Sequence, residues 1–569
     1  MLVVQKDGHE AVATSHQLTL KMRLQQSLHT ALLGASLALA APHGSNCSAP
    51  ADLTKKCADF ASHLVVEGGV VNGSYFVPAG TNFSAPLYHP SCAAAPTLIT
   101  RDMCRVVLQV STSERSGFRM EAWLPINWTG RFLSVGNGGL NGCISFDDLA
   151  YTAGLGFAAV GTNNGHDGQT GLPFYNNPGV VEDFAYRALH TGVVVGKQIT
   201  KTFYGKAHDK SFYLGCSTGG RQGFKSAQDF PDDFDGILAG APAVAFNNLT
   251  SWSGHFYPIT GPANSSTFVP LSLWAVVHAD VLKQCDGLDG HVDGILEDPL
   301  MCHYDPSDLA CVQGSNSSTC LTPAQLQTVK KIYLPLVNGE GDLVYPPIQY
   351  GAEIPVASIL ANGQSFIYTD DWFRYVVYND PSWDPATLGP KDYDYSAKLD
   401  PFGIQTWKGD LSGVRDRGAK VLHWHGQADP IISSDNSPRY YDHVRSTMNA
   451  TTKELDEFYR FFRVSGTSHC GGGDGAHAIG QSLGEVNGLE PSHNVLMALV
   501  DWVEKGNAPE TIIGTKFVND TASLGIELQR AHCRFPRRNQ YKGSGDPNVP
   551  ESWECVETDE AVSWEVAQQ

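Results

Sequence analysis

Short apolar segments alternate with longer amphipathic segments along most of the chain. Apolar runs of three to five residues bounded by polar or glycine residues are typical of buried strands. Such runs lie at 106–110, 120–124, 132–135, 157–161, 212–214, 236–239 and 421–424. Helical patterns lie at 181–196 and 495–505. Strands that alternate with helices predict an α/β fold with a mostly parallel sheet covered on both faces.

The alternation is lost between residues 241 and 404. Trp, Tyr, Pro and Gly replace the strand pattern there, and four cysteines lie close together. The strand pattern resumes near residue 418, so the chain is expected to return to the same sheet. We therefore predict a core formed by residues 41–240 and 405–569, with residues 241–404 inserted as a lid domain.

The first 40 residues have the pattern of a targeting segment. Residues 1–21 are polar and are interpreted as an upstream extension, whereas Met22 opens a signal peptide at 22–40 with Lys21 and Arg23 as its positive charges. The apolar run at 28–41 is shorter than the roughly 20 residues that cross a membrane. An internal buried helix is the alternative. The interpretation predicts secretion without a membrane anchor.

The composition limits the classes of partner and the cellular compartment that are expected for the protein. Of 569 residues, 42% are apolar and 17% charged, which excludes a largely disordered chain. The net charge of −20 disfavours nucleic acid and anionic membranes as partners. Thirteen cysteines without paired zinc spacings favour disulfides and secretion. The oligomeric state stays open. Nine glycosylation sequons agree with secretion, at Asn46, Asn72, Asn82, Asn127, Asn248, Asn264, Asn316, Asn449 and Asn519.

A G-x-S-x-G pattern is the sharpest chemical signal. Gly215, Ser217 and Gly219 follow an apolar run and precede a helix. In this setting the glycines leave room for a strained turn that exposes the serine as a nucleophile. The following helix points its first amides at an oxyanion formed there.

The serine needs a base and a carboxylate, and the order Ser, Asp, His is that of α/β-hydrolases. Asp429 follows the 421–424 run, and His469 lies in a glycine-rich loop after another apolar run. We predict Asp429 as the orienting acid, with an ordinary Asp-Pro turn as the alternative. We predict His469 as the base. Its rivals are His166, His423 and His425, of which the last two are better explained as packed or pocket-lining residues.

Two cysteines adjoin the predicted nucleophile and base. Cys216 precedes Ser217, and Cys470 follows His469. If the serine and the histidine meet, the two cysteines can pair and fix both backbones. Buried free thiols are the alternative.

This doubled Cys-Ser and His-Cys arrangement resembles the fungal and bacterial tannase and feruloyl esterase family of α/β-hydrolases. The resemblance extends from about Cys57 to Cys555 and implies an α/β-hydrolase core with a large inserted lid. The turn at 136–142 resembles the second oxyanion-hole element of esterases, with Gly138 or Gly139 donating one amide and Thr218 the other. A plain tight turn is the alternative.

The predicted lid holds three carboxylates in eight residues, Asp286, Asp289 and Asp293. They would repel one another unless a hard cation drew them together, and calcium suits oxygen ligands. The spacing is not that of an EF-hand. The resemblance implies a structural Ca²⁺ held by these side chains and by the carbonyls of His291 and Ile295; metal-free Asp-Gly turns are the alternative. No organic cofactor is expected.

The other cysteines divide into predicted pairs. Cys285 lies near enough in sequence to clamp the Asp-rich loop to Cys302. The family's pattern implies the pairs Cys57–Cys104, Cys92–Cys143, Cys311–Cys320 and Cys533–Cys555. Cys47 is left over.

The resemblance implies two-step hydrolysis of phenolic esters, either feruloyl esters of plant cell-wall polysaccharides or gallate esters of tannins. An aromatic segment at 371–378 together with Trp383 offers a surface for a phenolic ring, although core packing explains these residues equally well. The lid lacks the Lys-Arg processing site found in fungal tannases, which favours the feruloyl esterase. An inactive secreted binding protein of the same fold is a distant alternative.

Overall fold

The computed structural model describes residues 51–314 and 318–558. The predicted upstream extension (1–21), the predicted signal peptide (22–40), Asn46, Cys47 and Asn316 lie outside these residues. Among the described residues, no helix combines the length and the hydrophobicity that crossing a bilayer requires.

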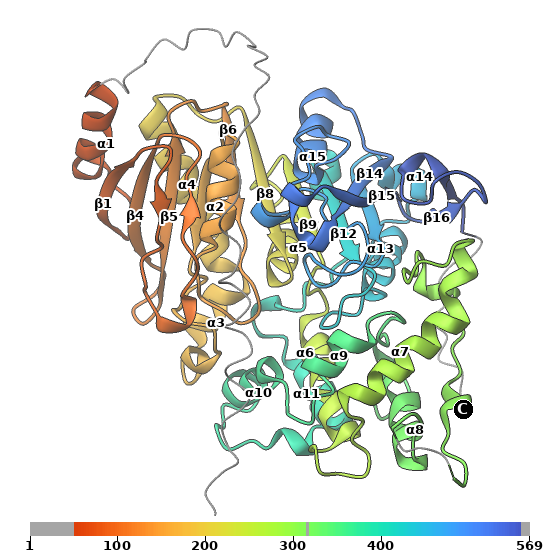
Figure 1. The fold of residues 1–569 in the computed structure, drawn as a ribbon. Coiled ribbons are helices and arrows are strands. Elements are labelled where there is room, and N and C mark those ends of the chain that lie inside the picture. The colour runs from red at the N-terminus through yellow and green to blue at the C-terminus, as the bar shows by residue number, and fades with distance from the viewer. Residues whose placement is uncertain (1–50, 315–317, 559–569) are drawn as a thin grey trace, which may run out of the picture. The chain divides into compact units, whose positions relative to one another are not determined.

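A nine-stranded sheet organises the described residues, with the strand order β1-β4-β5-β7-β6-β8-β9-β12-β13 (Figure 1). Its strands are β1 (Gly69–Val77), β4 (Met103–Ser111), β5 (Gly117–Pro125), β6 (Arg131–Val135), β7 (Ala158–Thr162), β8 (Lys210–Cys216), β9 (Gly236–Gly240), β12 (Lys420–Gly426) and β13 (Tyr459–Val464). The seven predicted strands are all present. The sequence pattern missed two strands. In β1 the polar and glycine residues at 72–74 separate two short apolar stretches, and in β13 Arg460 and Arg463 interrupt the apolar residues.

The sheet is parallel only in the half that extends from β7 to β13. The neighbours from β7 to β13 pair in parallel, whereas β1, β4 and β5 pair antiparallel. Only a short turn separates β4 from β5, and such a connection permits only an antiparallel pair. The prediction of a mostly parallel sheet therefore holds for the half that carries the candidate chemistry.

Helices cover both faces of the sheet, as alternate side chains of one strand show. Tyr213 of β8 packs into a core with α4 and α5, whereas Phe212 and Leu214 pack into a second core with α2 and α15. The helix predicted at 181–196 is interrupted by a π-helical turn at Asp183–Arg187. The helices outside the insertion are α1 (Ala51–His63), α2 (Phe146–Gly154), α3 (Pro178–Glu182), α4 (Ala188–Tyr204), α5 (Thr218–Asp229), α12 (Ser412–Asp416), α13 (Asn436–Thr447), α14 (Thr452–Asp456) and α15 (Val495–Lys505).

A long insertion separates the neighbouring strands β9 and β12, and Figure 1 shows it mainly in green. It contains α6 (Phe246–Thr260), α7 (Leu271–Cys285), α8 (Pro323–Ile332), α9 (Glu353–Ile359), α10 (Ile367–Trp372), α11 (Pro390–Leu399) and the small sheet of β10 (Leu336–Val337) and β11 (Leu343–Tyr345). Its core includes Trp252 and Trp372 but also Leu140, Phe174 and Phe184. The insertion thus shares its core with the segment that precedes the nucleophile strand.

Three further two-stranded sheets and six disulfides complete the described chain. The sheets pair β2 (Asn82–Phe83) with β3 (Thr97–Leu98), β14 (Thr511–Phe517) with β15 (Ile526–Cys533), and β16 (Arg538–Tyr541) with β17 (Trp553–Val556). The disulfides are Cys57–Cys104, Cys92–Cys143, Cys216–Cys470, Cys285–Cys302, Cys311–Cys320 and Cys533–Cys555. These are the pairings that the sequence and the resemblance implied.

Candidate active site

The three residues expected to form a triad lie after strands of the parallel half-sheet. Ser217 directly follows β8, Asp429 follows β12, and His469 follows β13. Since the carboxyl ends of parallel strands meet at one edge of a sheet, segments more than 200 residues apart in sequence converge there.

Ser217 occupies a strained turn. Its backbone has φ 66° and ψ −125°, a conformation that is uncommon for a residue with a side chain. The flanking glycines permit it: a Cβ atom on Gly215 would lie 2.8 Å from the backbone of Gly219, and one on Gly219 would lie 3.1 Å from the carbonyl oxygen of Asn137. Close packing of α5 against the loop after β6 thus excludes larger residues.

Asp429 and His469 are joined directly. Nδ1 of His469 lies 2.7 Å from Oδ2 of Asp429, whose side chain is fully buried. Oδ1 of Asp429 accepts the backbone amides of Ile431 and Ile432, each at 3.0 Å. Burial opposes ionisation of Asp429, but the charge of His469 and the hydrogen bonds from His425 and His469 outweigh it and hold the pKa of Asp429 below its ordinary value. Asp429 is therefore an ionised acceptor for His469.

A cavity of about 420 Å³ brings the serine and the histidine onto one surface. Its walls come from the loop after β6, the elbow, the loop after β13 and two side chains that the sequence did not indicate, Tyr368 and Asp148. The lining residues are Gly136, Asn137, Gly138, Gly139, Asn141, Cys143, Ile144, Ser145, Asp148, Gly215, Cys216, Ser217, Tyr368, Ile431, His469 and Cys470. A smaller apolar niche adjoins Ser217 between Thr218, Phe246, Leu249 and Tyr368.

The expected oxyanion donors lie together beside Ser217. Gly138 and Gly139 line the cavity, and Gly139 has φ +52°. Thr218 is the first residue of α5, so its amide belongs to those that a helix leaves without an internal partner. Oγ1 of Thr218 donates to the carbonyl oxygen of Gly139 at 2.7 Å, which ties the two groups to each other.

The rival histidines have other partners. His166 is buried, and its Nε2 lies 2.8 Å from the carbonyl oxygen of Leu140. His423 and His425 are fully buried on β12, but His425 also contacts Asp429, with Nε2 at 3.1 Å from Oδ2. The sequence offered no signal for this contact beyond the spacing of the two residues.

The aromatic segment at 371–378 does not face Ser217. Trp372 and Phe373 are fully buried in the core of the insertion, and the ring of Trp383 stacks on Phe373 at 4.9 Å. Core packing, the alternative explanation, therefore accounts for these three residues. The aromatic residues near the serine are instead Tyr368, Phe366 and Phe246.

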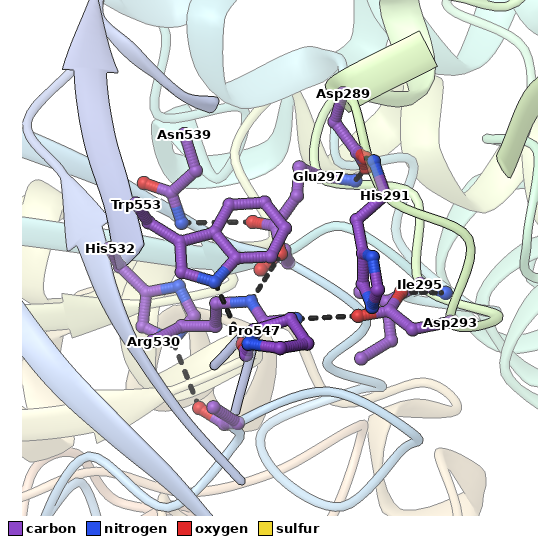
Figure 2. Close-up of polar contacts among 12 residues, drawn as sticks. Asp289, His291, Asp293, Ile295, Glu297, Arg530, His532, Asn539, Pro547 and Trp553 are labelled. Atoms are coloured by element: carbon purple, nitrogen blue, oxygen red, sulfur yellow. Dashed lines mark hydrogen bonds and ion pairs between the residues drawn. The ribbon is translucent and has the colours of Figure 1, made fainter. Parts of the chain in front are cut away.

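The Asp-rich loop lies against the C-terminal sheets (Figure 2). Each carboxylate accepts a backbone amide of its own loop: Asp286 from Gly294, Asp289 from His291, and Asp293 from Ile295. Burial, and then the nearby carboxylates of Glu297 and Asp293, raise the pKa of Asp289 to about 7. The loop thus concentrates negative charge in a buried place.

Arg530 neutralises part of this charge. Its guanidinium contacts Asp293 at 2.5 Å and Glu297 at 2.9 Å and packs over the ring of Trp553. Within residues 51–314 and 318–558, no three His, Cys, Asp or Glu side chains form a cluster suited to a metal ion. A cation held by all three carboxylates would therefore have to draw them closer together and bind backbone carbonyls as well. The all-oxygen donor set suits Ca²⁺ in its chemistry.

Most of the glycosylation sequons are accessible. Asn72, Asn82, Asn127, Asn264, Asn449 and Asn519 are exposed. Asn248 is half-buried, and its Nδ2 donates to the carbonyl oxygen of Val344 at 3.1 Å. A glycan on Asn248 would have to break this hydrogen bond.

A parallel half-sheet with a serine at a nucleophile elbow and a hydrogen-bonded Asp–His pair at the same edge is the architecture of an α/β-hydrolase. The family model described as tannase and feruloyl esterase matches residues 104–364 and 396–556. The chain belongs to this family.

Relatives and solved structures agree with this assignment. The chain is 53% identical over 501 residues to the probable feruloyl esterase B-2 of Aspergillus oryzae, covering 88% of this chain and 95% of that one. The crystal structure of feruloyl esterase B from Aspergillus oryzae matches with a TM-score of 0.86 at 49% identity, over 88% of this chain and all of that one. The tannin acyl hydrolase from Aspergillus niger matches with a TM-score of 0.70 at 23% identity, over 89% and 96%, which shows a shared fold.

Proposed function

We propose that the protein hydrolyses feruloyl esters of plant cell-wall polysaccharides by a serine acyl-enzyme mechanism. The observation that carries the proposal is the hydrogen bond between His469 and Asp429 on the wall of the cavity that also contains Ser217. The high identity to feruloyl esterases B over most of both chains supports the acyl group. Tannase is only a distant structural relative.

In the proposed mechanism each residue has one task. Because Nδ1 of His469 donates to Asp429, Nε2 is left to accept the proton of Ser217 as Oγ attacks the ester carbonyl. The amides of Thr218 and of Gly138 or Gly139 stabilise the oxyanion. When the tetrahedral intermediate collapses, the alcohol leaves and takes the proton from His469. Water, deprotonated by His469 in turn, then releases the acid and restores Ser217.

The surroundings of Ser217 suit an ester of an aromatic acid and a sugar. On one side lie the polar groups of Asn141 and Asp148, and on the other the apolar niche with Phe246 and Tyr368. We infer that the phenolic ring lies toward the niche and the sugar toward the polar side. Aromatic side chains favour the flat ring, and amides and carboxylates favour hydroxyl groups.

We further propose a structural Ca²⁺ at the Asp-rich loop. Asp286, Asp289 and Asp293 would contribute carboxylates, and His291 and Ile295 would contribute carbonyl oxygens. The raised pKa of Asp289, which is caused by burial and then by the carboxylates of Glu297 and Asp293, supports the proposal, because a divalent cation would stabilise the ionised carboxylates there. The ion supplies cohesion of the loop and takes no part in the ester chemistry. We also propose that the protein is secreted and carries glycans on the exposed sequons.

Specificity constants for methyl ferulate, methyl caffeate and methyl gallate test the acyl preference. We expect kcat/KM for methyl ferulate to exceed that for methyl gallate by at least about tenfold, which corresponds to about 1.4 kcal/mol of transition-state stabilisation. A preference for gallate would assign the site to tannin-type esters instead. Hydrolysis of none of the three would place the substrate outside phenolic esters.

A further inference from the structure

Two histidines share one oxygen of the candidate triad's carboxylate. Oδ2 of Asp429 lies 2.7 Å from Nδ1 of His469 and 3.1 Å from Nε2 of His425. The side chains of His425 and Asp429 are both fully buried. In the mechanism above, His425 has no task.

A chain of buried polar groups continues behind His425. Its Nδ1 lies 2.6 Å from Oγ of Ser437, at the start of α13. Oγ of Ser437 lies 2.9 Å from Nε2 of His423, and Nδ1 of His423 lies 2.9 Å from the hydroxyl of Tyr459 on β13. Ser437, His423 and Tyr459 are each at most 1% exposed. The whole chain from Tyr459 to the carboxylate of Asp429 therefore lies within the core.

The ionised carboxylate fixes the direction of the first hydrogen bond in this chain. Asp429 only accepts, so Nε2 of His425 donates. When the ring of His425 carries one proton, its Nδ1 accepts from the hydroxyl of Ser437. Oγ of Ser437 then accepts from Nε2 of His423, and Nδ1 of His423 accepts from the hydroxyl of Tyr459. This assignment uses each hydrogen once and fixes the tautomer of both histidines.

The remote members of the chain stay uncharged. Burial, and then the charge of His425, lower the pKa of His423 well below its ordinary value, and burial raises the pKa of Tyr459. Tyr345 also lies within electrostatic reach of Asp429, and burial raises its pKa too.

We propose that His425, held by Ser437, is a positioning residue that fixes the carboxylate of Asp429 in the orientation required by His469. The inference rests on the proposed serine mechanism. Without the donor at 3.1 Å, Oδ2 would lose one of its two partners. Only His469 itself and the amides of Ile431 and Ile432 on Oδ1 would then hold the carboxylate, so its orientation would be less tightly fixed. Misplacement of His469 would follow, and catalysis is sensitive to displacements of about 1 Å.

The variants His425→Phe and His425→Gln separate positioning from packing. Phenylalanine keeps an aromatic ring but donates no hydrogen bond, whereas the amide of glutamine can donate in place of Nε2. With p-nitrophenyl acetate, we expect H425F to lower kcat by about 10- to 100-fold with KM within about twofold. The acid limb of its pH–rate profile should move to higher pH, because a carboxylate with fewer donors attracts the imidazolium more strongly. H425Q should restore most of the wild-type kcat and most of the wild-type pH–rate profile.

Controls keep the inference falsifiable. His443→Phe removes a half-buried histidine on α13 that stacks on Trp407, and it should leave kcat and the profile unchanged. If H425F does not fold, Ser437→Ala removes only the hydroxyl that orients His425 and should lower kcat by about three- to tenfold. The inference fails if folded H425F, or S437A in its place, matches the wild type, or if H425Q is as impaired as H425F. A wild type that neither hydrolyses the ester nor reacts with a fluorophosphonate would instead refute the proposed function.

Discussion

Cys216 and Cys470 are joined by a disulfide with their Cα atoms 5.9 Å apart, although 254 positions separate them in sequence. Each adjoins a residue of the candidate triad, Ser217 or His469. Cys470 has φ 63°, and Ser217, which follows Cys216, has φ 66°, so a residue with unusual dihedrals lies at or beside each end of the bond. The bond therefore constrains the relative position of the nucleophile and the base.

Removing this disulfide should impair catalysis before it unfolds the protein. We expect Cys216→Ala with Cys470→Ala to lower kcat by about 10- to 100-fold at 25 °C, since displacements of about 1 Å have effects of this size. Steady-state kinetics and a thermal melt of the same sample provide the measurement. The double variant Cys311→Ala and Cys320→Ala, which opens a loop of sequence separation 9, should lower the melting temperature without changing kcat. Full activity in the variant that lacks Cys216 and Cys470 would show that this disulfide stabilises the fold without positioning the catalytic residues.

Ser217→Ala should remove the nucleophile and leave the fold intact. The hydroxyl of Ser217 is the only group lost, so we expect ester turnover to fall at least about a thousandfold with an unchanged melting curve. A fluorophosphonate probe should label the wild type and not the variant. Near-normal turnover in folded S217A would contradict the assignment.

Thr218→Val tests the link between the two oxyanion donors. The hydrogen bond from Oγ1 of Thr218 to Gly139 disappears, so the loop that carries Gly139 is free to shift away from the oxyanion. We expect kcat to fall about tenfold with little change in KM, a fraction of the effect of losing a whole donor. Thr218→Ser keeps the hydroxyl and should retain activity; equal losses in both variants would speak against this role.

Asp148 on the cavity wall should make stability depend on pH. Burial is the main cause that raises its pKa to about 6, so the folded state holds a proton that the unfolded chain releases near pH 3.8. The folded state binds more protons between these values, and its stability falls as pH rises through them. Asp148→Asn should therefore match the wild type below about pH 4 and exceed it by about 3 kcal/mol at pH 7.

Urea titrations of D148N and the wild type at pH 4 and pH 7 measure this difference. Asp147→Asn removes the same charge at an exposed neighbour and should show no such rise. A gap between D148N and the wild type that is independent of pH would contradict the prediction.

Chelation should lower the stability of the purified protein without stopping the chemistry. A ligand that binds only the folded state contributes about 2.7 kcal/mol at a hundredfold excess over its Kd. We expect EDTA to lower the melting temperature, calcium to restore it, and Asp289→Asn to respond to neither. An unchanged melting curve in chelator, with no metal in the protein, would refute the calcium site.

The sequence by itself determined the local parts of this protein. The elbow at Ser217, the order Ser217, Asp429, His469 and the seven strands predicted from apolar runs are properties of neighbouring residues, and short-range sterics and hydrophobic periodicity report them. The strand β1 lacked such periodicity because its register shifts between Val71 and Gly73, which breaks the alternation of apolar and polar residues. Only the tertiary structure decided that β1, β4 and β5 run antiparallel, that Tyr368 and Asp148 line the cavity, and that His425 shares the carboxylate of Asp429 with His469. These relationships join segments that are distant in sequence or depend on where a side chain points, and packing of the whole chain sets both.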